Sequence, residues 1–380
     1  MNIRPLSLIL ITLSLAGIGC ATKPTIDTTP IATIDTQQAY TKTLSGTTEN
    51  AKLTLSITSA FGKVRGSFIY TENSSSTTGI VFGNTSDTKE LLFGFYTGQW
   101  DEFANATGTW QDNTLNLDIA RTAKAPTKFS LTQTKDTGAK ISVTTASGSD
   151  KRTDGTERCT FNFAYPVLEN ENANTIIKKE FGLGATTTPQ LLANEFIARC
   201  KTDIEDLLSN TTTADYAKDA AYDSETLFSV ERNRDQIISF LIDSYDFEGG
   251  AHGMPGIYGV NINLESGTSL ALGDIIKRDS LKPFMQKIEK QLLAEYTDAL
   301  FEEPLTEFKK FIADKKPATE AELVTFAGHN NFYLTNSSIV FYWNVYEISP
   351  YAAGQLTVEV PFSEIRDMLR SDAPGSTLTQ

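Results

Sequence analysis

One histidine lies in the most glycine-rich stretch of this 380-residue chain. Residues 244–274 read SYDFEGGAHGMPGIYGVNINLESGTSLALGD, which places His252 among Gly249, Gly250 and Gly253. An imidazole can transfer protons near neutral pH or contact a ligand. Glycines this dense indicate positive φ angles or the close approach of another group, because a Cβ would clash there. His252, these glycines and Tyr258 are therefore the candidate binding residues.

A catalytic histidine needs partners, and the sequence offers few. Asp243, Asp246 and Glu248 precede His252, but side chains along a strand alternate between its faces and cannot all reach one imidazole. No Gly-x-Ser-x-Gly motif supplies a nucleophile. We therefore expect no catalytic residue, and we expect His252 to hydrogen-bond its own turn. Contact with a ligand or partner is the second interpretation, and catalysis is the third.

The remaining metal-ligating residue types do not form a familiar site. The second histidine, His329, lies between Gly328 and Asn330 and is expected to be a solvated loop residue. Two distant histidines and two distant cysteines do not match the ligand spacing of a closed zinc site. The sequence therefore predicts neither a metal nor another cofactor.

The N-terminus predicts export. Residues 1–19 carry Arg4 and an apolar run over residues 6–18, which is too short to span a bilayer and is typical of a secretory signal. Residues 16–20, AGIGC, resemble a bacterial lipobox, although Gly17 stands where leucine is usual. Cys20 is thus the expected lipidation site and the only expected link to a membrane. Ordinary cleavage after Ala21 is the alternative.

Two further cysteines, Cys159 and Cys200, remain in a chain expected to enter an oxidising compartment. An even number there favours a disulfide, and two buried free thiols are the alternative. Cys200 belongs to an apolar stripe with helical spacing, which would pack on the strand that begins at Cys159. The pair is therefore expected to fasten a helix to a sheet.

The charge balance limits the possible partners. The chain has 33 basic and 47 acidic residues, a formal net charge of −14. Nucleic acid and anionic membrane surfaces would repel such a protein. The charge serves solubility in the simplest interpretation, and it also suits a cationic partner.

Hydrophobic periodicity divides the chain into a tether and α+β domains. Residues 20–45 are rich in Thr and Pro and predict a lipid-anchored tether, whereas residues 46–135 alternate in short, glycine-punctuated runs that predict a small antiparallel β barrel or sandwich. Trp100 and Trp110 either line a groove there or, more often for such residues, belong to the core.

Two α+β lobes with antiparallel sheets and packed helices follow, over residues 136–240 and 241–372. The first has a strand from Cys159 that ends at Pro166, helices over 173–181 and 188–208, and strands over 227–230 and 236–247 with 231–235 as their turn. The second has a hairpin turning at 265–268, helices over 281–300 and 302–315, strands over 331–334, 339–348 and 356–360, and a closing helix over 363–369. Four tyrosines there could form a recognition surface or pack within the sheet: Tyr258, Tyr342, Tyr346 and Tyr351.

Several stretches of the second half resemble a bacterial family of paired extracytoplasmic domains of unknown function. They are Tyr165-Pro166, GGAHG at 249–253, the hairpin over 261–274, FYWNVYEISPYA at 341–352 and GQLTVEVPF at 354–362. In that family the pair forms the ectodomain of lysozyme-sensing RsiV-type anti-sigma factors and part of PdaC-type peptidoglycan deacetylases. The resemblance covers residues 141–369 and implies an α+β fold and a location in the cell envelope.

The resemblance implies less about activity. In the deacetylases the chemistry belongs to a separate metal-dependent domain, and its Asp and His-x-x-x-His ligands do not occur here. We expect a non-enzymatic binding lipoprotein, facing the periplasm or the cell exterior, that recognises a cationic lysozyme-like protein or peptidoglycan. The alternative is an envelope polymer hydrolase, or a deacetylase-related enzyme, that uses His252.

Overall fold

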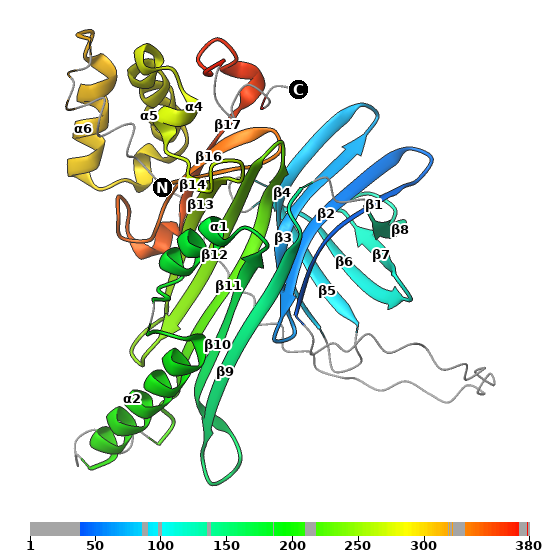
Figure 1. Cartoon of the computed structure of the whole chain (residues 1–380), viewed down its shortest axis with the longest axis vertical. Helices are drawn as coiled ribbons and strands as arrows, with labels where there is room; N and C mark the ends of the chain where they lie inside the picture. The colour runs from blue at the N-terminus through cyan, green and yellow to red at the C-terminus, as the bar shows by residue number, and fades with distance from the viewer. Residues whose placement is uncertain are drawn as a thin grey trace.

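The computed structural model describes residues 39–85, 90–97, 101–134, 138–184, 186–209, 218–317, 319, 321, 331–371 and 378. The predicted α+β fold is confirmed: an antiparallel barrel comes first, and a six-stranded and a three-stranded sheet with packed helices follow (Figure 1). None of the helices in these ranges is long and apolar enough to cross a membrane.

The alternating runs of the first part close into an eight-stranded barrel. Each strand pairs antiparallel with the next, and β8 returns to β1, where Leu44 lies opposite Gln133. Side chains such as Leu53, Phe68 and Phe129 fill the interior. The strands are β1 (Tyr40–Thr47), β2 (Ala51–Ala60), β3 (Lys63–Glu72), β4 (Ser75–Thr85), β5 (Leu91–Thr97), β6 (Asp101–Gln111), β7 (Thr114–Ala120) and β8 (Thr127–Gln133).

The barrel begins earlier than the sequence indicated. Residues 40–45 were expected to belong to the tether, but they form most of β1, and the fully buried Leu44 anchors this strand in the barrel core. A strand with a single fully buried apolar residue among threonines gives little periodic signal. The rest of the expected tether, together with Cys20 and residues 1–19, lies outside the described residues.

The first sheet of the second half has the order β14-β13-β12-β11-β10-β9. β10 and β11 run parallel, and the other neighbours are antiparallel. The boundary expected between residues 240 and 241 falls within β12, so this sheet runs across it. Its strands are β9 (Ile141–Lys151), β10 (Glu157–Leu168), β11 (Tyr222–Arg234), β12 (Ile237–Phe247), β13 (Met254–Asn263) and β14 (Thr268–Ser269).

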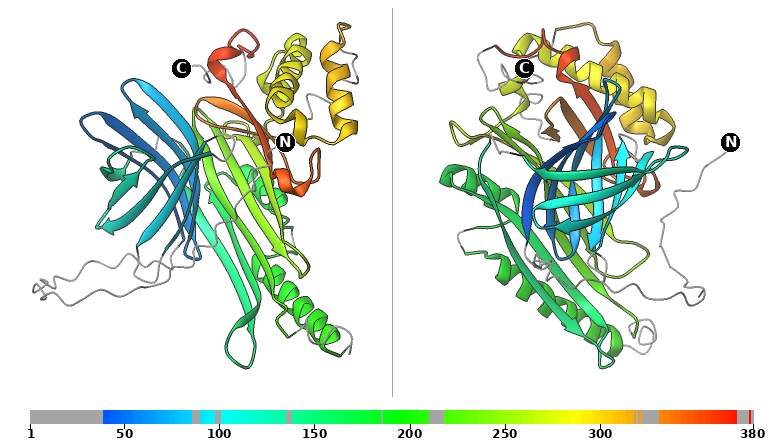
Figure 2. Two further views of the ribbon diagram at one scale, coloured as in Figure 1. Left: turned by 180° about the vertical axis from the view of Figure 1, so that it is seen from behind. Right: turned by 90° about the vertical axis from the view of Figure 1, so that its right-hand side faces the viewer.

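Helices cover one face of this sheet, and the barrel lies against the other (Figure 2). The helices are α1 (Glu171–Glu180) and α2 (Pro189–Ser209), close to the predicted ranges. The expected disulfide is present and joins Cys200 on α2 to Cys159 on β10. Pro166 does not end β10, because the parallel partner β11 pairs only with residues up to Phe163 and requires no N–H from residue 166.

The second sheet contains β15 (Phe332–Leu334), β16 (Ser338–Trp343) and β17 (Leu356–Pro361). It packs against α4 (Leu272–Ile275), α5 (Leu281–Tyr296) and α6 (Glu302–Ala313) around an apolar core that includes Phe284, Phe332 and Phe341. The helix expected over 363–369 is wrong: only a short 3₁₀ turn, Phe362–Glu364, forms there, and the following residues are turns. The apolar residues of this segment still face the core: Phe362, Ile365 and Leu369 are all buried. Their helix-like spacing therefore reflects turns that pack on the core.

Candidate functional site

The Gly-His loop joins β12 to β13. Gly249 and Gly250 have φ angles of +84° and +98°, a conformation that side-chain-bearing residues rarely adopt. Gly253 is needed for a different reason: a Cβ at this position would overlap the ring of Tyr245. The glycines therefore turn the chain sharply and press the loop onto the end of β12, as their density indicated.

His252 lies exposed on this loop and contacts two tyrosines from a distant part of the chain. Its ring stacks on Tyr351 with centroids 3.8 Å apart. Nδ1 lies 3.1 Å from the carbonyl oxygen of Gly253, and Nε2 lies 3.4 Å from the hydroxyl of Tyr346. Tyr351 also donates a hydrogen bond of 2.9 Å to the Gly253 carbonyl. The imidazole thus both bonds its own loop and takes part in an aromatic cluster.

The three acidic residues upstream of His252 have other partners. Asp243 forms an ion pair with Arg65 of the barrel, Asp246 accepts a hydrogen bond of 2.6 Å from Ser224, and Glu248 pairs with Arg199 on α2. Each of these three carboxylates is thus bound to a partner other than His252. This arrangement suits contact with a partner better than proton transfer.

The four singled-out tyrosines have three different environments. Tyr346 is half exposed and has a φ angle of +68°, which is uncommon for a large side chain. Tyr342 is buried and accepts a hydrogen bond from the backbone N–H of Gly259. Tyr258 is exposed, but its neighbours Ile257 and Gly259 face the three-stranded sheet, so Tyr258 points to the opposite side of β13.

Four side chains therefore form one surface around the loop, here named the Tyr–His surface: Tyr245, His252, Tyr346 and Tyr351. Burial and the nearby Tyr351 raise the pKa of the Tyr245 hydroxyl above its usual value. Tyr258 lies apart from this surface. His329 and Trp100 fall outside the described residues, and Trp110 packs edge-on against Tyr40 of the barrel.

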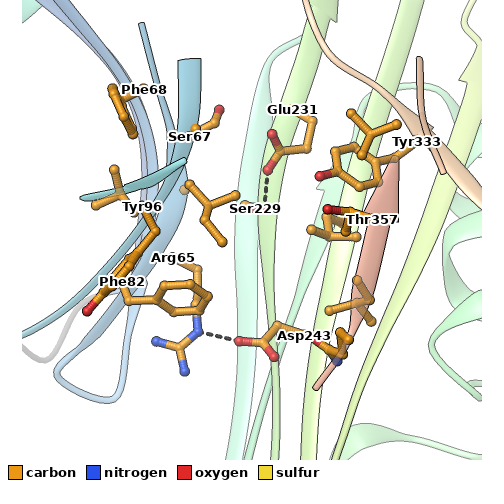
Figure 3. Close-up of a pocket in the computed structure, with 18 of the residues that line it drawn as sticks. Arg65, Ser67, Phe68, Phe82, Tyr96, Ser229, Glu231, Asp243, Tyr333 and Thr357 are labelled. Atoms are coloured by element: carbon orange, nitrogen blue, oxygen red, sulfur yellow. Dashed lines mark hydrogen bonds and ion pairs between the residues drawn. The ribbon is translucent and has the colours of Figure 1, made fainter. Parts of the chain in front are cut away.

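A second site is a cavity of about 1050 Å³ that lies between the barrel and both sheets (Figure 3). Its first wall is the outer face of β3, β4 and β5, with Arg65, Ser67, Ile80, Phe82 and Tyr96. Its second wall is the helix-free face of the six-stranded sheet, with Asp223, Glu225, Ser229, Glu231 and Asp243. Its third wall carries Tyr333, Val340, Thr357 and Glu359 from the three-stranded sheet.

The ion pairs of the cavity are concentrated at one end. The guanidinium of Arg65 contacts Asp243 and Glu225 and lies over the ring of Phe82, 4.9 Å from its centroid. The ammonium of Lys63 also pairs with Glu225. Burial raises the pKa of the Asp223 carboxyl, although the charge of Lys63 lowers it in part. This end therefore holds the barrel to the sheet by charge.

The other end of the cavity carries uncharged and acidic groups. The Glu231 carboxyl is buried and accepts a hydrogen bond from Ser229, and its pKa is raised by burial. Burial also raises the pKa of Tyr333 well above its usual value, and the charges of Glu231 and Glu359 raise it further.

This cavity was not predicted from the sequence, and Glu231 shows why. Residues 231–235 were expected to be a turn, but β11 continues to Arg234, and the turn consists of Asp235 and Gln236 with φ angles of +55° and +60°. Glu225, Ser229 and Glu231 share one face of β11 because strand side chains alternate. Acidic residues that fall on one face of this strand, Asp223, Glu225 and Glu231, were the available signal. Among the described residues, no three His, Cys, Asp or Glu side chains are grouped to hold a metal ion.

Comparison with known families finds two matches in the second half of the chain. Residues 153–255 match the family described as "Deacetylase PdaC", and residues 273–363 match "Protein of unknown function (DUF3298)". The second half is therefore similar to these two domain families. The resemblance stated from the sequence is therefore confirmed, and the PdaC match includes His252 and its loop. Neither match includes the barrel.

Two solved structures are similar to this chain. A DUF3298 family member from Bacteroides fragilis has a TM-score of 0.46 at 22% identity, and the alignment covers 64% of this chain and 99% of that one. A DUF3298 family protein from Pseudomonas aeruginosa has a TM-score of 0.39 at 16% identity, and the alignment covers 62% and 96%. No curated protein matches the chain.

Proposed function

We propose that this protein is an exported, lipid-anchored binding module of the cell envelope and that its Tyr–His surface recognises a cationic protein, such as a lysozyme-like hydrolase. Both domain matches point to an envelope-associated protein. The contact of His252 with Tyr346 and Tyr351 carries the proposal, because it presents three exposed or half-exposed aromatic rings on one surface. Among the described residues, the ring nitrogens of His252 lie near the Gly253 carbonyl and the Tyr346 hydroxyl, not near a carboxylate.

The chemistry of the surface supports a protein partner. Tyrosine supplies large contact area with little loss of side-chain entropy and is enriched where proteins bind each other. Tyr346 holds its backbone in the left-handed region, and such a conformation is often kept where a side chain must be aimed. The net charge of −14 would attract a cationic partner over a distance of about one Debye length.

Binding to hen egg-white lysozyme tests the proposal. We expect the purified chain to retain lysozyme at low salt and to release part of it at high salt, since long-range attraction is screened. His252→Ala and Tyr346→Ala should each weaken binding tenfold or more, because truncation of a central aromatic anchor costs about 1–2 kcal/mol or more. Calorimetry at two ionic strengths measures both effects.

Tyr258→Ala is the matched control, since Tyr258 is as exposed as Tyr346 but points to the other side of β13. We expect this variant to bind within twofold of wild type. No binding at low salt, or an equal loss in the Tyr258 variant, would contradict the proposal. Turnover of an envelope polymer that disappears in His252→Ala would favour the hydrolase instead.

The proposed anchor has its own test. Mass spectrometry of the mature N-terminus should find acyl chains on Cys20. A free Thr22 at the N-terminus would show ordinary cleavage and remove the lipid anchor from the proposal.

A further inference from the structure

The cavity between the barrel and the two sheets has the dimensions and position of a ligand site. Its volume of about 1050 Å³ lies at the upper end of the roughly 300–1,000 Å³ typical of small-molecule pockets, which occur preferentially between domains. Its barrel wall presents apolar and aromatic side chains, among them Ile80, Phe82 and Tyr96. These residues point outward from the barrel, whose interior is filled by the neighbouring inward-facing ones such as Val81 and Phe95.

The charged residues that line the cavity determine which sign of ligand charge it favours. The basic residues among the described lining are Lys63 and Arg65, and both are already paired with Glu225 or Asp243. The lining also includes four further acidic residues, with which no described lining cation forms an ion pair: Glu102, Asp223, Glu231 and Glu359. An anionic ligand would meet these carboxyls without a free cation to balance it, whereas a cationic ligand would be attracted.

The end of the cavity away from Arg65 offers acceptors for a hydrogen-bond donor. Glu231 lies at the buried floor, and Glu359 lies on the exposed side of β17. In Figure 3 the hydroxyl of Tyr333 points toward Glu231, and the charges of both Glu231 and Glu359 act on this hydroxyl. A donor group placed here would meet the carboxyl oxygens of Glu231 and Glu359 and the hydroxyl of Tyr333, all of which line the cavity.

We propose that this cavity binds a small cationic amphiphile, in which an apolar chain or ring packs against Ile80, Phe82 and Tyr96 and a primary amine or guanidinium lies between Glu231, Glu359 and Tyr333. The cavity shares Tyr245 with the Tyr–His surface, but the residues proposed to hold the ligand lie outside that surface, and the proposal does not depend on a protein partner. Recognition combines burial of apolar surface with charge-assisted hydrogen bonds, which are about twice as strong as neutral ones.

Three probes with the same apolar chain separate these contributions: n-octylammonium, n-octanol and octanoate. Titration calorimetry uses the full chain with Cys20→Ser, so that acyl chains do not compete for the cavity. We expect octylammonium to bind at least ten times more tightly than octanoate, with octanol between them. Octyltrimethylammonium keeps the charge but donates no hydrogen bond, and it should bind several-fold more weakly than octylammonium.

Variants locate the bound probe. Ile80→Trp fills the cavity from the barrel wall and should reduce octylammonium affinity tenfold or more, and Thr78→Phe on the same strand serves if the first variant does not fold. Leu92→Trp is the control, because Leu92 is exposed on the barrel and does not line the cavity. The double variant Glu231→Gln/Glu359→Gln should lose three- to tenfold in affinity for octylammonium and little for octanol.

The proposal is overturned by any of three results. They are the absence of octylammonium binding, octanoate binding as tight as octylammonium binding, and unchanged affinity in folded cavity-filling variants.

Discussion

Glu289 on α5 is a buried carboxyl whose environment favours the protonated form. Its Oε2 atom has no hydrogen-bond partner among the described residues, and burial raises its pKa from 4.5 to about 8. The folded protein therefore holds the proton more tightly than the unfolded chain does. The stability that this group contributes is fully present below about pH 4.5 and is lost as the pH rises through about 8.

Glu289→Gln should remove this dependence. Between pH 5 and pH 9 we expect the wild-type free energy of unfolding to fall by about 2–4 kcal/mol more than that of the variant, since each pKa unit corresponds to about 1.4 kcal/mol. Urea unfolding at several pH values measures the difference. Glu303→Gln changes an exposed glutamate of α6 and should leave the curve unchanged. Equal pH curves for wild type and Glu289→Gln would contradict the assignment.

Between elements, the close approach of β13 to β15 depends on a glycine. A Cβ on Gly259 would overlap the carbonyl oxygen of Phe332. Two hydrogen bonds lie on either side of this contact. The backbone N–H of Gly259 donates to the hydroxyl of Tyr342 at 2.9 Å, and the side-chain amide of Asn261 donates to the carbonyl oxygen of Phe332 at 2.9 Å. The two sheets are therefore joined by polar groups that a small backbone displacement would separate.

Gly259→Ala should consequently destabilise the protein by about 3 kcal/mol, because overpacking at a buried contact forces the backbone to move. Thermal and urea unfolding measure this change. Gly256→Ala is the control in the same strand: its Cβ would meet the side-chain tips of Ser244 and Tyr258, which can move. We expect a loss of less than about 1 kcal/mol there. Equal losses in the two variants would show that Gly259 is not a contact point between the sheets.

The elements differ in how far the sequence could predict them. Hydrophobic periodicity predicts α2 and most of the barrel strands, because each of these elements buries one face. The sharp turn of the Gly-His loop could be predicted from its glycines, because they allow backbone angles that other residues rarely adopt. β1 and the end of β11 were misjudged, because threonines and charged residues in a strand resemble a linker or a turn. The cavity could not be predicted from periodicity, since its walls come from three sheets and depend on how these pack. The Tyr–His surface combines residues about 100 positions apart, which no local pattern connects.

Across the whole molecule, the barrel is held to the six-stranded sheet by a small number of polar contacts. Arg65 on β3 pairs with Asp243 on β12 and with Glu225 on β11, and Ser56 on β2 donates a hydrogen bond of 2.8 Å to the carbonyl of Val230. Ala60 adds an apolar contact with Leu227. The ion pairs of Arg65 also form one end of the cavity, so loss of the barrel would open the ligand site.

A double-mutant cycle tests whether Arg65 couples the two parts. Arg65→Met leaves Asp243 without its cation in a setting where both side chains are about one-fifth exposed. We expect each of Arg65→Met and Asp243→Asn to destabilise the protein by about 2 kcal/mol, because each strands a partly buried charge. The double variant should lose about 1–2 kcal/mol less stability than the sum of the two single losses, since it leaves neither charge without its partner.

Arg65→Met combined with Glu72→Gln is the control. The partners of Glu72, Arg121 and Lys124, lie in the barrel, so the two losses of stability should add. Additivity in the Arg65–Asp243 cycle would show that this ion pair does not hold the barrel, and the packing around Ser56 and Ala60 would then carry the attachment.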